Sequence, residues 1–341
     1  MTKLSICHLS EGIAGHDGQA LGIIKTLKDA GFDIKAITIK VEWRIRPLRG
    51  ALRFISRKLT KCPNSLSIKI ISYCYKFIFP EDINVIISSG ANLAPLNLAL
   101  AKKYKLKNIH LSTPRDWDIS DFTAYVTSSK VSNSSSNLVP DIIPNLFDPK
   151  ECEKQGKRFI DENDIQDTQF SLLILGGDGI GYSFQQEEWH EIVEKFINFC
   201  KSKTTVPLFI TSRRTPQNVE DYIKNNHNSD MSVFYHSEKE RGKFDHLLFI
   251  SKHIFVTEDS STMISEAISS GKKIVSIFPK TINAPSKYKN IIAKYENLGF
   301  IERCKTKNID EFSFLEDADI SEVVQKSIKN FQNSLSDRLK D

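Results

Sequence analysis

The sequence lacks a paired-cysteine pattern, a long apolar run and an N-terminal targeting segment. Its six cysteines are scattered without a C-x-x-C pair, so neither a zinc site nor a disulfide framework is expected. No stretch approaches the roughly 18 apolar residues needed to span a bilayer. The first residues reach a polar, glycine-containing turn after one short apolar run, unlike a signal peptide or an anchor. These absences predict a cytoplasmic protein, at most peripheral on the inner face of the cytoplasmic membrane.

The length and composition are those of a globular protein with two domains. The chain has 341 residues, of which 40% are hydrophobic and 26% charged, so it exceeds one ordinary core and is neither disordered nor fibrous. Lys and Arg number 47 against 42 for Asp and Glu, a net charge of +5. This mild excess favours anionic partners without demanding nucleic acid.

Short apolar strands alternate with helices along the chain. Residues 4–9 are predicted to form a strand, residues 10–18 a glycine-containing turn and residues 19–30 a helix. Similar units follow until a polar stretch with several prolines, residues 128–149, interrupts them. A second round then begins with a strand over residues 171–175. This regular alternation predicts parallel sheets with helices on both faces.

We therefore expect an α/β protein with two Rossmann-like domains that face a central cleft. The N-terminal domain is predicted over residues 1–150 and the C-terminal domain over residues 151–318. The closing residues 319–341 are predicted to form an amphipathic helix that packs back across the domain junction. Its expected inward residues are Val323, Ile328, Phe331 and Leu335.

The turn after the first strand is the first candidate site. Its glycines, including Gly15, let backbone N–H groups approach a ligand, and the start of the next helix favours an anion. Ligands of open α/β sheets bind at the carboxyl ends of strands, where this turn lies. His16 is predicted to act there as a general base on an acceptor hydroxyl, with Asp17 orienting it. The alternative is that Asp17 caps the helix and His16 is solvated.

A second glycine-rich turn, GGDGIGY at residues 176–182, ends the first strand of the second half. It matches no strict dinucleotide fingerprint, but its position is equivalent to that of the first turn. Two such turns would present both sheets to one cleft, as transfer between two substrates requires. Gly176 and Gly177 are therefore predicted to contact the donor. A tight connection that serves only packing is equally compatible with the sequence.

Two polar segments follow strands of the second half: TSRRTP at residues 211–216 and TEDSST at residues 257–262. Guanidinium groups bind phosphate oxygens bidentately, and the positive end of a helix that opens with serines attracts an anion. These segments predict a diphosphate site without a metal. Helix capping by Asp259 or Ser260 beside a surface arginine pair is the structural alternative. The predicted donor-binding residues here are Ser212, Arg213, Arg214, Asp259, Ser260, Ser261, Thr262 and Glu266.

The pair Asp116 and Asp118 has the D-x-D spacing that holds a divalent metal on a sugar nucleotide. We discount this role, because a one-sheet, metal-dependent transferase would not explain the second α/β round and the pattern arises often by chance. A loop or helix-cap role is expected instead. No metal ion or other cofactor is predicted.

Residues 43–80 carry nine basic residues and no acidic one. Aromatic and aliphatic residues are interleaved with these charges, a pattern typical of a surface that binds anionic lipid. The alternative is a pair of ordinary helices with core aromatics and solvated charges. Nucleic-acid binding is not expected, because no recognition motif accompanies the charge.

Five segments together resemble the ELM1 family. They are GIAGHDGQALG at residues 12–22, STPRDWDISDF at 112–122, LGGDGIGY at 175–182, FITSRRTP at 209–216 and VTEDSSTMISEAISSGKKIVSIFP at 256–279. The family contains bacterial proteins assigned as glycosyltransferases, including lipooligosaccharide outer-core enzymes, and a plant mitochondrial-fission protein. The resemblance implies a GT-B fold with an N-terminal acceptor domain, a C-terminal donor domain and no metal requirement.

The resemblance is compatible with two alternative functions. The first is transfer of a sugar from a nucleotide-activated donor to a saccharide acceptor, which we expect to be lipid-linked, as in a lipopolysaccharide core. The second is a non-catalytic adaptor that recruits partners to a membrane, as the plant relative suggests.

Overall fold

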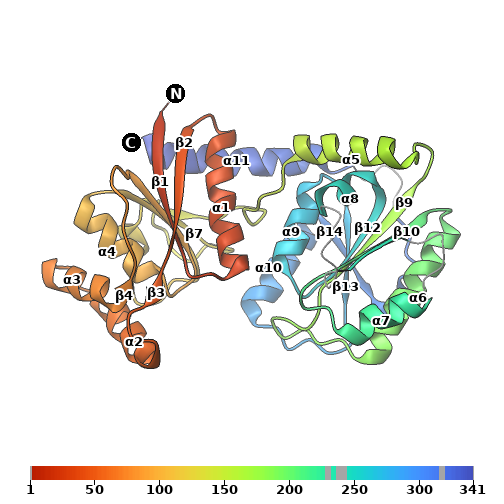
Figure 1. Cartoon of the computed structure of the whole chain (residues 1–341), viewed down its shortest axis with the longest axis horizontal. Helices are drawn as coiled ribbons and strands as arrows, with labels where there is room; N and C mark the ends of the chain where they lie inside the picture. The colour runs from red at the N-terminus through yellow and green to blue at the C-terminus, as the bar shows by residue number, and fades with distance from the viewer. Residues whose placement is uncertain (1, 227–231, 236–243, 315–318, 341) are drawn as a thin grey trace. The chain divides into compact units, whose positions relative to one another are not determined.

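The computed structural model describes residues 2–226, 232–235, 244–314 and 319–340, which form two compact α/β units (Figure 1). The first unit comprises the chain up to Leu146 together with the residues from Ser327 on, and the second runs from Phe147 to Lys326. The closing helix α11 (Ser321–Lys340) therefore contributes residues to both units.

The first unit is built on a parallel sheet with the strand order β2-β1-β5-β6-β7-β8. Both faces are covered, since successive residues of β1 and β5 are buried rather than every second one. Helix α1 (Ala14–Asp29) and the end of α11 share one hydrophobic core, whereas α3 (Ser65–Cys74) and α4 (Ala94–Tyr104) share another. The strands are β1 (Lys3–Ser10), β2 (Asp33–Lys40), β5 (Val85–Ser89), β6 (Lys107–Leu111), β7 (Ala124–Val126) and β8 (Asn137–Leu138).

The predicted inward face of the closing helix is correct at its C-terminal end only. Phe331 and Leu335 are buried in the first unit, but Val323 is exposed and its neighbour Val324 is buried instead. The buried positions follow spacings of three and four residues, and Val323 lies one residue, or about 100°, away from this stripe.

The second unit repeats the architecture, with the parallel strand order β11-β10-β9-β12-β13-β14. Phe196, Phe199, Phe209 and Phe255 meet edge to face in its core. The strands are β9 (Phe170–Leu175), β10 (Val206–Thr211), β11 (Ser232–Phe234), β12 (Ser251–Thr257), β13 (Ile274–Phe278) and β14 (Ile301–Lys305). The helices are α5 (Pro149–Asn163), α6 (Gln186–Ser202), α7 (Gln217–Asn226), α8 (Phe244–Ile250), α9 (Ser261–Ser269) and α10 (Ser286–Asn297).

Each sheet has a topological switch point next to its first strand. In the first unit the chain passes from β1 to β2 on one side and then to β5 on the other; in the second it passes from β9 to β10 and then to β12. The turns that follow β1, β5, β9 and β12 therefore lie at the edge where open α/β sheets bind ligands.

The insertion between β2 and β5 includes the basic residues 43–80. It contains α2 (Arg49–Leu59), α3 and a short antiparallel pair of strands, β3 (Glu42–Trp43) and β4 (Tyr75–Lys76). Its aromatic residues are found both in the core and on the surface: Tyr75 is buried, whereas Phe54 and Tyr73 are exposed. Within the described residues, no helix combines the length and apolar character needed to cross a membrane.

Candidate functional site

The turn after β1 is shorter than predicted, because α1 already begins at Ala14. Gly12 has a φ of +78°, a conformation that favours glycine, and it turns the chain into the helix. Gly15, His16 and Asp17 therefore lie in the first turns of α1 rather than in a loop. A Cβ added at Gly15 would meet no atom within 4 Å, so the space around Gly15 is open.

His16 is paired with Glu11, not with Asp17 as the sequence analysis predicted. The imidazole Nδ1 lies 2.8 Å from Glu11 Oε1, and the side chain of His16 is 37% exposed. Glu11 Oε2 accepts a second hydrogen bond from Asn92 in the turn after β5. Burial opposes ionisation of Glu11, but these hydrogen bonds and the charge of His16 outweigh it and lower the pKa of Glu11. A carboxylate that is ionised and fixed in this way can orient an imidazole.

Gly90 makes room for this pair. It follows β5 with a φ of +90°, and an added Cβ would overlap both the ring of His16 and Glu11 Oε1. The motifs did not reveal roles for Gly90, Glu11 and Asn92, because only the adjacency of β1 and β5 brings their segments together. The EG dipeptide in the first turn was the available signal.

Asp17 neither orients His16 nor caps the helix. Its carboxylate accepts a 2.8 Å hydrogen bond from the hydroxyl of Ser10 and lies 3.5 Å from Nε2 of the buried His8. The N-cap of α1 is Ile13, which makes no capping hydrogen bond with its side chain. Burial lowers the pKa of His8, and the charge of Asp17 opposes this shift. Asp17 therefore links α1 to the end of β1, and both earlier interpretations of it are wrong.

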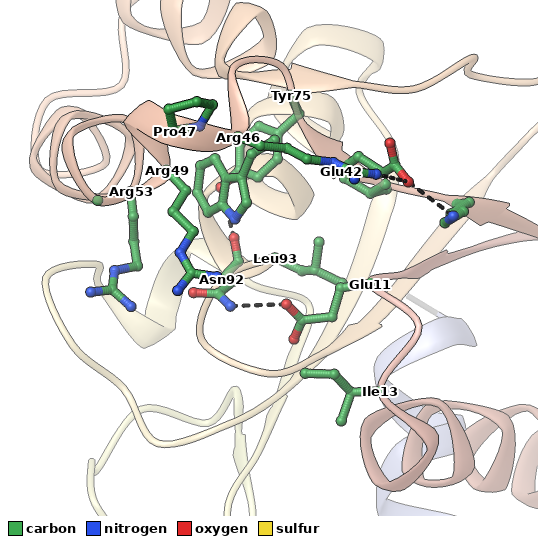
Figure 2. Close-up of a pocket in the computed structure, with 14 residues that line it drawn as sticks. Glu11, Ile13, Glu42, Arg46, Pro47, Arg49, Arg53, Tyr75, Asn92 and Leu93 are labelled. Atoms are coloured by element: carbon green, nitrogen blue, oxygen red, sulfur yellow. Dashed lines mark hydrogen bonds and ion pairs between the residues drawn. The ribbon is translucent and has the colours of Figure 1, made fainter.

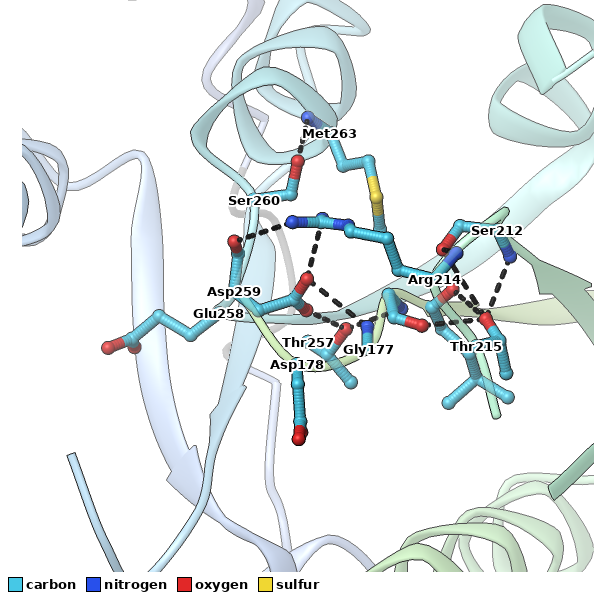
Figure 3. Close-up of polar contacts among 12 residues, drawn as sticks. Gly177, Asp178, Ser212, Arg214, Thr215, Thr257, Glu258, Asp259, Ser260 and Met263 are labelled. Atoms are coloured by element: carbon cyan, nitrogen blue, oxygen red, sulfur yellow. Dashed lines mark hydrogen bonds and ion pairs between the residues drawn. The ribbon is translucent and has the colours of Figure 1, made fainter. Parts of the chain in front are cut away.

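In the second unit, the glycine-rich turn after β9 packs tightly against its neighbours (Figure 3). A Cβ at Gly176 would overlap the carboxylate of Asp259, and a Cβ at Gly177 would overlap the carbonyl oxygen of Arg214. Their backbone N–H groups donate to Thr257 Oγ1 and to Asp259 Oδ2. These two amides are thus occupied by protein acceptors, as the packing alternative predicted.

Asp259 and Arg214 form a buried ion pair. Arg214 Nη2 lies 2.6 Å from Asp259 Oδ2; the side chain of Asp259 is fully buried and that of Arg214 is 32% exposed. Burial raises the pKa of Asp259, and the guanidinium of Arg214 is the largest opposing influence. Asp259 therefore holds Arg214 in place and does not itself face a ligand, contrary to its predicted role.

The remaining predicted donor residues surround this ion pair. Ser260 is the N-cap of α9 and accepts a long 3.5 Å hydrogen bond from the amide of Met263, as the capping alternative predicted. Ser212 Oγ accepts from the backbone N–H of Arg214. Arg213 is exposed, and no hydrogen bond or ion pair of its guanidinium is found in the described part of the chain. The half-buried residues of α9 in the predicted set are Ser261, Thr262 and Glu266.

A second buried ion pair supports the same loop and was missed from the sequence. Glu258, which is fully buried, accepts bidentate hydrogen bonds of 2.8 and 2.7 Å from Arg303 on β14. It also accepts hydrogen bonds from Tyr182 and Ser276. Glu258 thus ties the glycine-rich turn to β13 and β14.

The D-x-D pair is structural. Asp118 caps a 3₁₀ helix (Ile119–Asp121) by accepting from the amide of Ser120, which confirms the predicted cap. Asp116 is bound by Arg57 and Lys58 of α2, at 2.8 and 3.3 Å. No group of three or more His, Cys, Asp or Glu side chains in the described ranges is arranged to hold a metal ion.

The fold places the protein in the GT-B class of α/β proteins with two Rossmann-like domains. An E. coli structure described as trehalose-6-phosphate bound with UDP-2-fluoro glucose is similar, with a TM-score of 0.51, 13% identity and 98% of each chain covered. Arabidopsis thaliana UGT89C1 complexed with UDP has a TM-score of 0.52 at 9% identity, covering 99% of this chain and 100% of that one. UDP-GlcNAc 2-epimerase from Methanocaldococcus jannaschii also has a TM-score of 0.52, at 13% identity over 97% of this chain and 93% of that one.

The chain belongs to the mitochondrial fission ELM1 family, whose sequence model matches residues 14–327. The family resemblance drawn from the sequence motifs is thereby confirmed. A curated relative, uncharacterized protein RP120 of Rickettsia prowazekii (strain Madrid E), is 34% identical over 119 residues, which are 34% of this chain and 33% of that protein. The match thus spans about a third of the length of that relative.

Proposed function

We propose that the protein transfers a glycosyl group from a nucleotide-activated sugar, bound by the second unit, to a saccharide acceptor bound by the first. The observation that carries this proposal is the His16–Glu11 pair at the β1/β5 switch point of a GT-B fold. A partly exposed imidazole held by a largely buried carboxylate is an arrangement that suits a general base.

The proposed reaction is a substitution at the anomeric carbon of the donor sugar. The acceptor hydroxyl oxygen attacks that carbon, its proton passes to Nε2 of His16, and the bond from the anomeric carbon to the diphosphate oxygen breaks. Glu11 stabilises the imidazolium that forms. We propose that Arg213 and the serine-rich start of α9 stabilise the negative charge of the departing nucleoside diphosphate, without a metal ion.

Nucleotide binding tests the donor side of this proposal. We expect one nucleoside diphosphate of a panel to stabilise the protein by about 2.7 kcal/mol at 100 times its dissociation constant. The Arg213→Gln variant should reduce this stabilisation, because the exposed guanidinium would lose its contact with phosphate. Differential scanning fluorimetry measures both effects, with Lys201→Gln, an exposed residue of α6, as the control for lost charge.

Two results would contradict the proposal. No response to any nucleotide would favour the membrane adaptor. Conversion of the sugar while it stays on the nucleotide would indicate an epimerase, a reaction found on the same fold; a transferase instead releases nucleoside diphosphate only when a saccharide acceptor is present.

We also propose that the acceptor is lipid-linked and that α3 carries the first unit to the anionic inner face of the cytoplasmic membrane. Helix α3 has two apolar stripes. One faces the core through Ile71 and Cys74; the other, with Leu66 and Tyr73 each 66% exposed and Ile70 between them, faces outward. The positions of this outer stripe recur every three or four residues, so they share one face of the helix. The basic residues of the insertion complement an anionic surface.

Vesicle binding tests the outer stripe. The double variant Leu66→Ser and Tyr73→Ser should lower affinity for vesicles of phosphatidylcholine with phosphatidylglycerol by roughly tenfold or more, because two apolar side chains no longer enter the interface. Val323→Ser removes an exposed apolar residue outside the insertion and is the matched control. Cosedimentation reports both variants. Equal binding by wild-type and double variant would refute this contact.

A further inference from the structure

The first unit contains a cavity of about 760 Å³ that is lined in part by Glu11, the partner of His16 (Figure 2). Its walls come from the turns after β1 and β5, from the segment that follows β2 and from the start of α2, the first α-helix of the basic insertion. The cavity therefore lies at the switch point of the sheet, where the proposed acceptor would bind.

The charges that line the cavity do not balance. Its two acidic residues are already engaged: Glu11 binds His16 and Asn92, and Glu42 binds Lys40 at 2.9 Å and Arg46 at 3.2 Å. Two further arginines, at positions 49 and 53, also line it. Among the described residues, neither of their guanidinium groups has a hydrogen bond or an ion pair with a protein group. The cavity thus presents two cations without protein counter-charges.

These two arginines are placed to act on one group. Arg49 and Arg53 are four residues apart on α2, so their side chains leave the same face of the helix about one turn apart. Figure 2 shows both side chains extending from the helix in a similar direction. Like charges at this spacing repel and destabilise a helix slightly, an effect that a bound anion would reverse. Guanidinium groups match the oxygens of phosphate and carboxylate in geometry as well as in charge.

An aromatic wall completes the cavity. The ring of Trp43 stacks on that of Tyr75, with centroids 4.5 Å apart, and the Tyr75 hydroxyl donates to the carbonyl oxygen of Asn92 at 2.7 Å. This fixes the aromatic pair to the turn after β5. Rigid aromatic surfaces with a few polar groups are typical of sites for small organic ligands.

We infer that this cavity binds an anionic saccharide, with the phosphate or carboxylate of the sugar held by Arg49 and Arg53. One such molecule would place its acid group at α2 and a hydroxyl toward His16. The inference rests on the proposed function only in naming that saccharide as the acceptor. The phosphate of an anionic lipid head group has the same chemistry, so the test separates the two sources.

Calorimetric titration of the full chain with glucose 6-phosphate and with glucose is the experiment. We expect the phosphorylated sugar to bind at least about tenfold more tightly than glucose, because charge-assisted hydrogen bonds to arginine are added. The double variant Arg49→Gln and Arg53→Gln should abolish this preference. The control, Lys28→Gln with Lys35→Gln, removes two exposed charges of the same unit that do not line the cavity and should keep it.

Several outcomes overturn the inference. They are equal affinity for the two sugars, binding of neither, and an unchanged preference in the arginine double variant. Loss of binding to phosphatidylglycerol vesicles in that variant, without a preference for glucose 6-phosphate, would assign the arginines to a lipid head group instead. The titration needs no sugar-nucleotide donor, so an absence of nucleotide binding would contradict the proposed function but not the anion site. Conversely, glycosyl transfer by a protein whose cavity does not prefer the phosphorylated sugar would overturn this inference but not the proposed function.

Discussion

Replacing His16 by glutamine should lower the turnover number for glycosyl transfer by about 10²- to 10⁴-fold, the usual contribution of a general base. Glutamine keeps polarity at this half-exposed position but cannot take the proton of the acceptor hydroxyl. The loss should appear in kcat rather than in the dissociation constant of the nucleotide, which the second unit binds. Steady-state kinetics and nucleotide titration of the same variant check both expectations.

A comparison of Glu11→Gln with Asp17→Asn shows which carboxylate supports His16. Glu11 contacts the imidazole at 2.8 Å, whereas Asp17 binds Ser10 and lies near His8. Glu11→Gln should therefore lower kcat by about tenfold or more, and Asp17→Asn should lower it far less. An unchanged kcat in His16→Gln would exclude a general-base role for His16. A larger loss of kcat in Asp17→Asn than in Glu11→Gln would instead support the pairing of His16 with Asp17 that the sequence predicted.

Replacing Arg214 by methionine should reduce the free energy of unfolding at neutral pH by about 2–3 kcal/mol. Removing one partner of a buried ion pair costs about 3–5 kcal/mol, and the partial exposure of Arg214 lessens this penalty. Asp259 would be left fully buried without its counter-charge. Denaturant unfolding measures the change. Arg213→Met is the matched control, because the neighbouring guanidinium is exposed, and it should change stability by no more than about 0.5 kcal/mol.

The same variant should regain stability in acid. Burial raises the pKa of Asp259 above its ordinary value, and loss of Arg214 raises it further. Between the ordinary pKa in the unfolded chain and the raised pKa in the folded state, the folded protein binds more protons, so its stability increases as pH falls. The deficit of Arg214→Met relative to wild-type should therefore narrow on acidification. A deficit that is constant or widens would show that Asp259 is not the group left uncompensated.

The fold was predictable because its signals are local. The strand–turn–helix alternation predicted a parallel α/β architecture in each half, and strands β1 and β9 lie where the sequence indicated. The predictions failed where a local pattern was ambiguous. Helix α1 begins before Gly15, since Gly15 and Gly18 weaken the helix without ending it. Helix α5 follows the segment assigned to the domain boundary and was not predicted, although Asp148 and Pro149 form an N-terminal capping sequence.

The site was predictable as a set of segments but not as a set of contacts. The motifs pointed to the turn that holds His16 and to the segments that hold Arg214 and Asp259. They predicted a pairing of His16 with the adjacent Asp17 and a ligand contact for Asp259. In the structure Glu11 turns toward Asn92 and His16, and Asp259 turns inward to Arg214. These pairings cross between strands, so they depend on the order of the strands in each sheet.

The sequence alone determined the family, the two rounds of α/β structure and the polar turns that end the central strands, because periodicity, glycine turns and motifs act over short stretches of chain. Only the tertiary structure decided which side chains meet there. It placed Gly90 against His16, closed the amides of Gly176 and Gly177 to a ligand, and left Arg49 and Arg53 without a protein counter-charge beside an open cavity. A side chain's partner is set by whatever the folded backbone brings within hydrogen-bonding distance, which neighbours in the chain do not reveal.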